Sequence, residues 1–189
     1  TACNKSGMNI APLLFKKHTH QAGMTREALR HVRTPMIMFV EHDTPIEGHF
    51  AKCVDIKGIT RAIRDHADVN MVRLHYDQAI HAEHTHLMLG DRPELRAGVP
   101  LLKTQQWSQR PHVASAAFYE WMLDNYFADN SLTMIEDRVH GSLQSAYIDG
   151  NWDRWGTWIY AEGWPDDMKY SSHSDARGRD SKFENTFTW

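Results

Sequence analysis

Three ionisable residues in a row, Glu41, His42 and Asp43, follow an apolar run without any spacer in the stretch PMIMFVEHDTP at 35–45. The run at 36–40 has the length and composition of a β-strand, and apolar residues on both of its faces are typical of a strand buried in an α/β sheet. Open α/β folds bind their ligands at the carboxyl ends of the strands. The pattern therefore predicts carboxylates at a ligand-binding edge. A solvated turn after a strand is the alternative.

A second transition from apolar to acidic residues occurs in TMIEDRVHG, where Met134 and Ile135 precede Glu136 and Asp137. If this segment opens a helix, both carboxylates lie near the positive end of the helix dipole. One interpretation is an ordinary acidic helix start. The other is a general base in a cleft, which would take a proton from an attacking hydroxyl group.

Polar groups also gather around one tryptophan in the stretch QWSQRPH at 106–112. An aromatic face with hydrogen-bonding groups beside it suits a saccharide, which has apolar faces and hydroxyl edges. Arg110 is the natural partner for a phosphate. A structured loop around a packed tryptophan is the alternative. The residues predicted to bind substrate are Gln106, Trp107, Gln109 and His112.

Three histidines lie close together in HAEHTHLMLG, and they raise the alternative of a His-rich zinc-binding or hydrolytic protein centred on His81, His84 and His86. The spacing does not match the HExxH motif of helical zinc sites. On a strand, His84 and His86 would share one face, but no third ligand follows locally. A polar loop beside a ligand cleft is the interpretation that we favour.

The composition bounds the class of protein. A chain of 189 residues with 41% hydrophobic residues has the size of one ordinary domain with a substantial core, which we place at 1–189. The formal net charge of −3 gives no strong attraction to nucleic acid, and no apolar run is long enough to cross a bilayer. Two cysteines make no disulfide framework and favour a reducing compartment. We expect a cytoplasmic protein, free or peripheral to a membrane, whose residues 165–189 form a flexible C-terminal segment.

The elements that must position these residues alternate between helix and strand, which indicates an α/β fold. Thr25 is the expected N-cap of the first helix, and the polar stretch at 91–100 is expected to be a loop. The predicted helices are 25–32, 56–66 and 114–127, and the predicted strands are 36–40, 69–76 and 158–160.

Taken together, these stretches resemble a nucleotide-sugar glycosyltransferase of the GT-A fold. REALRHVRTPMIMFVEHDT is similar to the family's helix, strand and Asp-x-Asp-type metal motif, which here reads Glu41-His42-Asp43. The stretch at 135–137, Ile-Glu-Asp, is similar to the family's x-Glu-Asp motif, and His173 lies where many members place a late histidine. The resemblance covers roughly residues 25–179, and the order of the motifs is its strongest part.

This resemblance implies an α/β fold with a GT-A (Rossmann-like) mixed sheet flanked by helices. The family has two β-α units before the metal motif, which bind the nucleotide base, whereas only forty residues precede Glu41 here. We therefore expect an N-terminally shortened form of the fold. The motif also departs from Asp-x-Asp in its first residue.

The resemblance further implies a metal-dependent enzyme that moves a sugar from a nucleoside-diphosphate sugar, expected to be a UDP-sugar, to a hydroxyl group of a saccharide or glycan acceptor. Mn²⁺ or Mg²⁺ would be held by Asp43 and His173, and Glu41 would bind the ion through water or contact the donor ribose. Such hard cations prefer oxygen ligands and neutralise a diphosphate leaving group. Arg177 and Arg110 would bind the diphosphate.

By the same resemblance, a carboxylate of the x-Glu-Asp motif is the base of an inverting reaction. Either Asp137 or Glu136 can fill this role, and Asp137→Asn is expected to abolish transfer while leaving donor binding nearly intact. Closure of residues 171–179 would exclude water from the donor. A truncated, inactive relative that serves only as a binding module is the remaining alternative.

Overall fold

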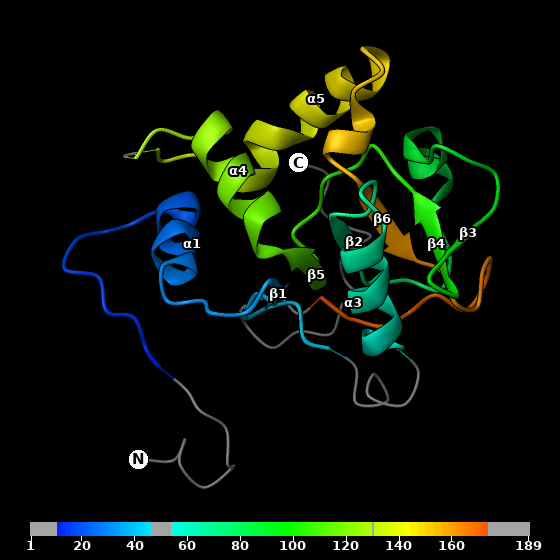
Figure 1. Ribbon diagram of the computed structural model, residues 1–189, viewed down its shortest axis with the longest axis horizontal. Helices are drawn as coiled ribbons and strands as arrows, with labels where there is room; N and C mark the ends of the chain where they lie inside the picture. Colours follow the sequence, from blue (N-terminus) through cyan, green and yellow to red (C-terminus); the bar gives the residue numbers. More distant parts are fainter. Residues whose placement is uncertain (1–10, 47–53, 130, 174–189) are drawn as a thin grey trace, which may run out of the picture.

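The computed structural model describes residues 11–46, 54–129 and 131–173 (Figure 1), and the structural statements below concern these residues. Its elements are α-helices, strands and short 3₁₀ helices, the last labelled η. In chain order they are α1 (Gln21–Leu29), β1 (Met36–Phe39), α3 (Ile56–Asp65), β2 (Met71–Arg73), η2 (Ala82–Leu87), β3 (Glu94–Arg96), β4 (Val99–Lys103), β5 (His112–Ser115), α4 (Ala116–Tyr126), α5 (Ile135–Ile148), η3 (Trp152–Arg154) and β6 (Thr157–Tyr160).

The six strands form one mixed sheet in the order β1-β5-β2-β6-β4-β3. Only β2 and β6 are parallel, and every other neighbouring pair is antiparallel. An α/β fold with a mixed sheet and flanking helices is thus confirmed. The expectation that 36–40 is buried on both sides is wrong, because β1 is an edge strand; its Met38 is 43% exposed, and Val40, which follows it, is 45% exposed.

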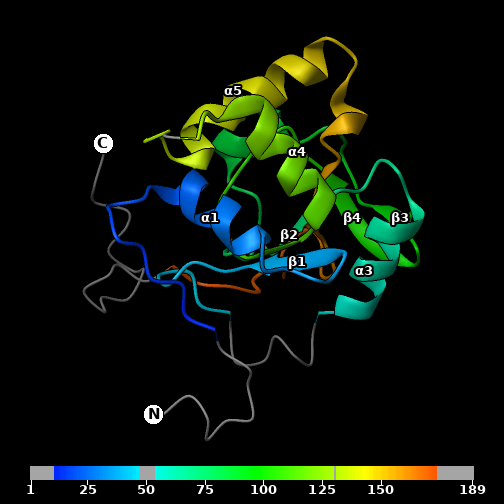
Figure 2. The same ribbon diagram turned by 60° about the vertical axis from the view of Figure 1, so that its left-hand side comes forward.

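Helices cover both faces of this sheet, with α1, α4 and α5 on one side and α3 on the other (Figures 1 and 2). Phe39, His112 and Arg73 are register partners across β1, β5 and β2, so their side chains share one face. The His112 ring bonds Tyr119 of α4, which identifies this face as the one under α4. On β6 the register partner of Arg73 is Ile159, so the side chain of the next residue, Tyr160, lies on the opposite face of the sheet. The Tyr160 hydroxyl accepts the N–H of Asp55, the N-cap of α3, which places α3 on that face.

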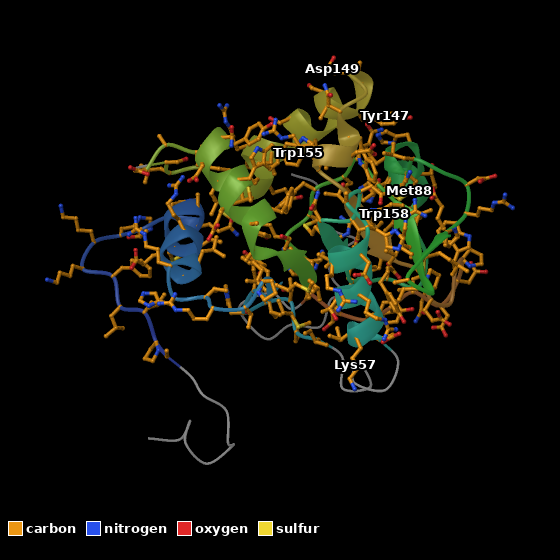
Figure 3. The ribbon with its side chains drawn as sticks, in the orientation of Figure 1. Lys57, Met88, Tyr147, Asp149, Trp155 and Trp158 are labelled. Atoms are coloured by element: carbon orange, nitrogen blue, oxygen red, sulfur yellow. The ribbon has the colours of Figure 1, made fainter. Side chains whose placement is uncertain are left out.

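Indole side chains dominate the core. Trp107, Trp155 and Trp158 are each at most 1% exposed, and Figure 3 shows Trp155 and Trp158 in the interior of the fold. Trp107 packs edge-on against Trp155 and also contacts Phe118 of α4. The loop that follows β4 is therefore anchored to the core by an aromatic side chain.

One glycine allows β6 to lie beside β2. The Gly156 carbonyl accepts from the N–H groups of Asn70 and Met71 at 2.8 and 3.0 Å, which starts the parallel pairing. Gly156 has φ +50°, and a Cβ there would lie 2.6 Å from the Asp68 carbonyl oxygen. A side chain at this position would separate the two central strands.

The polar stretch at 91–100 contains a hairpin, so the expectation of a plain loop is wrong. Strands β3 and β4 pair antiparallel across Ala97 and Gly98, whose φ values of +50° and +82° are those of a type I′ turn. This turn matches the twist of the two strands. The hairpin extends the sheet beyond β6.

Helices were predicted well at their centres and less well at their ends. The predicted helices at 56–66 and 114–127 are confirmed as α3 and α4, each with an N-cap side chain that accepts a backbone N–H. The segment carrying the acidic pair opens α5. Thr25 is not an N-cap, because α1 begins at Gln21 and Thr25 is buried within it.

Part of the segment 165–189, expected to be flexible, packs on the fold: Met168, Tyr170 and Ser171 are buried, whereas 165–167 are exposed and residues 174–189 lie outside the described residues. Tyr170 and Ser171 donate backbone N–H groups to the His75 carbonyl at 2.9 and 3.1 Å. Ser172 donates to the Pro45 carbonyl at 3.0 Å. We call residues 168–173 the C-terminal strap.

Candidate functional site

The candidate site lies where β1 ends and α5 begins, and Gln21 ties the two together. Its Nε2 donates to Glu41 Oε1 at 2.6 Å, and its Oε1 accepts the N–H of Ile135 at 2.8 Å. The Gln109 amide lies against both groups. When its nitrogen faces Glu41, it donates to Oε1 at 2.8 Å, and its oxygen accepts the N–H of Glu136 at 3.2 Å. Amide side chains thus bridge the two predicted acidic motifs.

The two neighbouring carboxylates of α5 have different surroundings. Asp137 is exposed, whereas Glu136 is half-buried. Burial is the largest influence on Glu136 and raises the pKa of its carboxyl group, while Arg73, the Gln109 backbone and Arg110 act in the opposite direction. The structure therefore brings Glu136 into the site and leaves Asp137 outside it.

Two guanidinium groups face this carboxylate. Arg73 on β2 is 3% exposed, and its Nη2 donates to Gln106 Oε1 at 2.9 Å. The Arg110 guanidinium lies 3.9 Å above the centre of the Tyr76 ring. Burial lowers the pKa of Arg73 to about 10 and also lowers that of Arg110.

Neither guanidinium is neutralised by a direct contact. Among the described residues, no carboxylate lies within ion-pair distance of Arg73 or Arg110. The Arg73 Nε and the Arg110 Nη1 are buried and have no hydrogen-bond partner within the described part of the chain. Buried cations normally have a counter-ion, so this pair is suited to an anionic ligand.

The turn after β1 carries the third part of the site. Thr44 donates its N–H to the Glu41 carbonyl at 3.2 Å, which closes a turn around Asp43. The C-terminal strap pairs with this turn through an Ile46–Ser171 bridge. As a result, His173 Nε2 lies 3.5 Å from Asp43 Oδ2. Two residues that are 130 positions apart in the chain therefore meet.

The Asp43–His173 pair suits a cation that takes few protein ligands. In the described ranges, no group of three or more His, Cys, Asp or Glu residues is placed to hold a metal. Mg²⁺ and similar hard cations are usually bound by one or two carboxylates, with phosphate oxygens and water completing the shell. The donor set fits such an ion, and it does not fit a closed structural zinc site.

Two of the predicted substrate-binding residues lie in the core and not in the site. Trp107 and His112 are both 0% exposed, so the prediction that Trp107 offers a face to a saccharide is wrong. Both ring nitrogens of His112 are engaged, because Nδ1 donates to the Arg110 carbonyl at 2.7 Å and Nε2 bonds the Tyr119 hydroxyl. These contacts position Arg110. The predicted diphosphate ligand Arg177 lies outside the described residues.

Of the three histidines of the alternative metal site, His81 and His84 are neighbours, with ring centroids 6.0 Å apart, but His86 makes no ring contact with them in the described structure. His81, His84 and His86 flank or lie in η2, where the predicted strand faces do not exist. His81 pairs with Asp77 at 3.0 Å and stacks on Tyr76. His86 is exposed, and these three residues make no metal-binding group.

Acid should destabilise the fold through two buried imidazoles. Burial lowers the pKa of both His75 and His112 to about 4. The unfolded chain binds these protons below about pH 6.5, so the stability they give is complete above that pH and falls as the pH drops toward 4, by up to about 3 kcal/mol each. The raised pKa values of Glu41 and Glu136 act in the opposite direction, with smaller shifts. Urea unfolding at pH 7.5, 5.5 and 4.5 measures this, and an unchanged free energy of unfolding would contradict it.

Three residues of the site were not found from the sequence. Arg73 gave a signal, since a charged residue inside the apolar strand pattern VNMVRLHY demands a partner or a function. Gln21 and Tyr76 gave none, because single polar or aromatic residues are common at such positions. Their roles depend on which distant segments the fold brings to them.

Comparison with known proteins adds no family to these observations. No protein-family model matches the chain, and no curated protein matches it either. Within the described residues, none of the helices has the length and apolar character needed to cross a membrane.

Proposed function

We propose that the protein is a metal-dependent glycosyltransferase of GT-A type that transfers a sugar from a nucleoside-diphosphate sugar to an acceptor hydroxyl group. The observation that carries the proposal is a pair of guanidinium groups, neither in contact with a carboxylate of the described residues, near a carboxylate–imidazole pair. A diphosphate supplies the missing negative charge, and its oxygens complete the shell of a divalent cation. The order of the motifs along the chain agrees with this use.

Each group of the site has a role in this reaction. Asp43 and His173 would hold Mn²⁺ or Mg²⁺, which neutralises the charge that develops on the leaving diphosphate. Arg110 contacts the diphosphate, and Arg73 adds positive electrostatic potential from its buried position on β2. Glu136 accepts the proton of the acceptor hydroxyl group as that oxygen bonds to the anomeric carbon and the diphosphate departs.

The surroundings of Glu41 support a binding role rather than a catalytic one. Gln21 donates to Glu41, and burial raises the pKa of the Glu41 carboxyl group. A carboxylate fixed by an amide donor is a poor mobile base but a good acceptor for a ligand hydroxyl group. We therefore give Glu41 a binding role and Glu136 the role of the base.

Calorimetric titration of UDP, and then of GDP, with and without Mn²⁺ tests the proposal. We expect nucleotide binding that requires the metal and that weakens at least tenfold, about 1.4 kcal/mol, in Asp43→Ala. Asp149→Ala is the matched control, because Asp149 lies exposed after the far end of α5 (Figure 3). Failure of wild-type protein to bind either nucleotide would overturn the proposal, and so would equal binding by Asp43→Ala.

A further inference from the structure

A pocket of about 480 Å³ lies beside the C-terminal half of α5, where that helix, α4 and η3 come together. We call it the α5 pocket. Its volume falls in the range of sites that hold small ligands. Its lining combines aromatic rings with hydroxyl, amide and charged side chains. Figure 3 shows two of these residues, with Asp149 at the end of α5 and Trp155 below it in that view.

Three aromatic side chains form the apolar part of the lining. Trp121 and Tyr126 belong to α4, and Trp155 follows η3. The Trp121 ring packs edge-on against Trp155 with centroids 5.4 Å apart, and the Tyr126 ring is tilted against Trp155 at 5.1 Å. Trp155 is buried, whereas Trp121 and Tyr126 are half-buried and keep part of their surface at the pocket. The pocket therefore has an aromatic wall that the core holds in place.

Polar side chains that are free to contact a ligand lie beside this wall. Ser145, Asn151 and Arg154 line the pocket and are exposed. The Asn151 side chain makes no capping bond to η3, although Asn151 is the N-cap residue. The Arg154 guanidinium lies 4.5 Å above the centre of the Trp121 ring. The pocket thus offers a hydroxyl, an amide and a guanidinium group next to aromatic surface.

The turn after α5 fixes where these polar groups lie. Gly150 has φ +73°, a conformation that ends helices and favours glycine. The N–H of Asn151 then donates to the Ala146 carbonyl at 2.7 Å, which folds the chain back against the end of α5. Arg154 donates its N–H to the Asn151 carbonyl at 3.2 Å. The backbone that carries Asn151 and Arg154 is therefore fixed before any ligand binds.

The charges at the pocket select against an ionic ligand. Arg154 and Asp149 both line it, and their opposite charges cancel at neutral pH. A cation would be repelled by Arg154, and an anion would be repelled by Asp149. A neutral ligand rich in hydroxyl groups meets no such repulsion. A saccharide is such a ligand, because its apolar faces suit an aromatic wall and its hydroxyl groups both donate and accept hydrogen bonds.

We propose that the α5 pocket binds a neutral saccharide at a place apart from the candidate site. Glu136 lies in the first turn of α5, and Ser145 follows nine positions later, which is about 14 Å along the helix axis. None of the residues assigned to sugar transfer lines the pocket. A glycan held here is anchored to the protein and does not react. The inference therefore goes beyond the proposed function and does not depend on it.

Titration with neutral oligosaccharides, without metal or nucleotide, tests the inference. The probes are maltotriose, cellotriose and triacetylchitotriose, and we expect at least one to bind with a dissociation constant of about 1 mM or lower. Ser145→Trp places an indole in the pocket and should weaken that binding at least tenfold. Ile148→Trp is the matched control, because Ile148 belongs to the same helix, is 80% exposed and lies outside the pocket lining. It should bind like the wild type.

A second variant removes hydrogen bonds without filling space. Asn151→Ala deletes an amide whose side chain does not cap η3, so the midpoint of thermal unfolding should stay within about 2 °C of the wild type. Saccharide affinity should fall several-fold. This variant keeps the test decisive if the added indole of Ser145→Trp prevents folding.

The remaining outcomes would overturn the inference. One is that none of the three oligosaccharides binds to the wild-type protein. Another is that one binds and both Ser145→Trp and Asn151→Ala keep full affinity, which would place the saccharide elsewhere on the protein. Tetramethylammonium and glucuronate serve as charged probes, and tighter binding of either than of every neutral oligosaccharide would identify a site for ions. Nucleotide binding enters none of these results, so the proposed function and this inference can fail separately.

Discussion

Replacing Glu136 with glutamine is expected to slow sugar transfer by two to four orders of magnitude, the usual contribution of a positioned general base. The amide keeps the shape of the side chain but cannot accept the proton of the acceptor. Because burial raises the pKa of Glu136, activity should also fall as the pH drops through that raised value, where the carboxylate becomes protonated. The rate of UDP release is measured with the UDP-sugar that gives the highest turnover.

Asp137→Asn is the matched control, and its expected effect reverses the one drawn from the sequence. Successive residues of a helix point about 100° apart, so only one of two neighbours can face a given site. Asp137 is exposed, and its loss should change turnover less than twofold. If Asp137→Asn were inactive and Glu136→Gln active, the assignment of the base would be wrong. Metal-dependent UDP binding should survive in both variants.

Arg73→Met is expected to make the fold more stable while it weakens metal-dependent UDP binding. A guanidinium that is 3% exposed, with no carboxylate in contact within the described structure, has lost hydration without gaining an ion pair. Methionine fills similar space without this penalty, so the free energy of unfolding should rise by about 1–2 kcal/mol. Metal-dependent UDP affinity should fall at least tenfold. Urea unfolding and calorimetry measure the two effects.

Arg96→Met provides the comparison for this experiment. Arg96 has ion pairs with Asp68 and Glu94 and lies over the Trp158 ring, outside the site. Its loss should lower the free energy of unfolding by about 1 kcal/mol and leave UDP binding unchanged. If Arg73→Met destabilised the protein as Arg96→Met does and still bound UDP normally, Arg73 would be a structural residue.

Local patterns predicted the elements but not their partners. The helices α3 and α4 followed from apolar spacing, and β1, β2 and β6 from short apolar runs. The hairpin at Ala97 and Gly98 was missed because two prolines nearby favoured a loop. The edge position of β1 could not be read from MIMFV, because burial on the outer side depends on what pairs there and not on the strand's own residues.

For the candidate site too, the sequence predicted local motifs but not how they are arranged in space. The acidic motifs were found because apolar runs ended in carboxylates, and the late histidine because the resemblance gave its place. The choice of Glu136 over Asp137 required the rotation of α5 about its axis. The burial of Trp107 required knowledge of how α4 and Trp155, which follows η3, pack against its loop. Both the orientation of Glu136 and the burial of Trp107 depend on contacts between segments that are distant in the sequence.

The strand order has a consequence for how the protein is made. β2 lies between β5 and β6, although α4 and α5 separate β5 from β6 in the chain. The central parallel pair therefore cannot form on the ribosome until residues 157–160 have emerged, and the strap that brings His173 to Asp43 is synthesised later still. Until then β2 and β4 lack the neighbour that β6 supplies, so a nascent chain stalled before Thr157 exposes two unpaired strand edges, which favour aggregation.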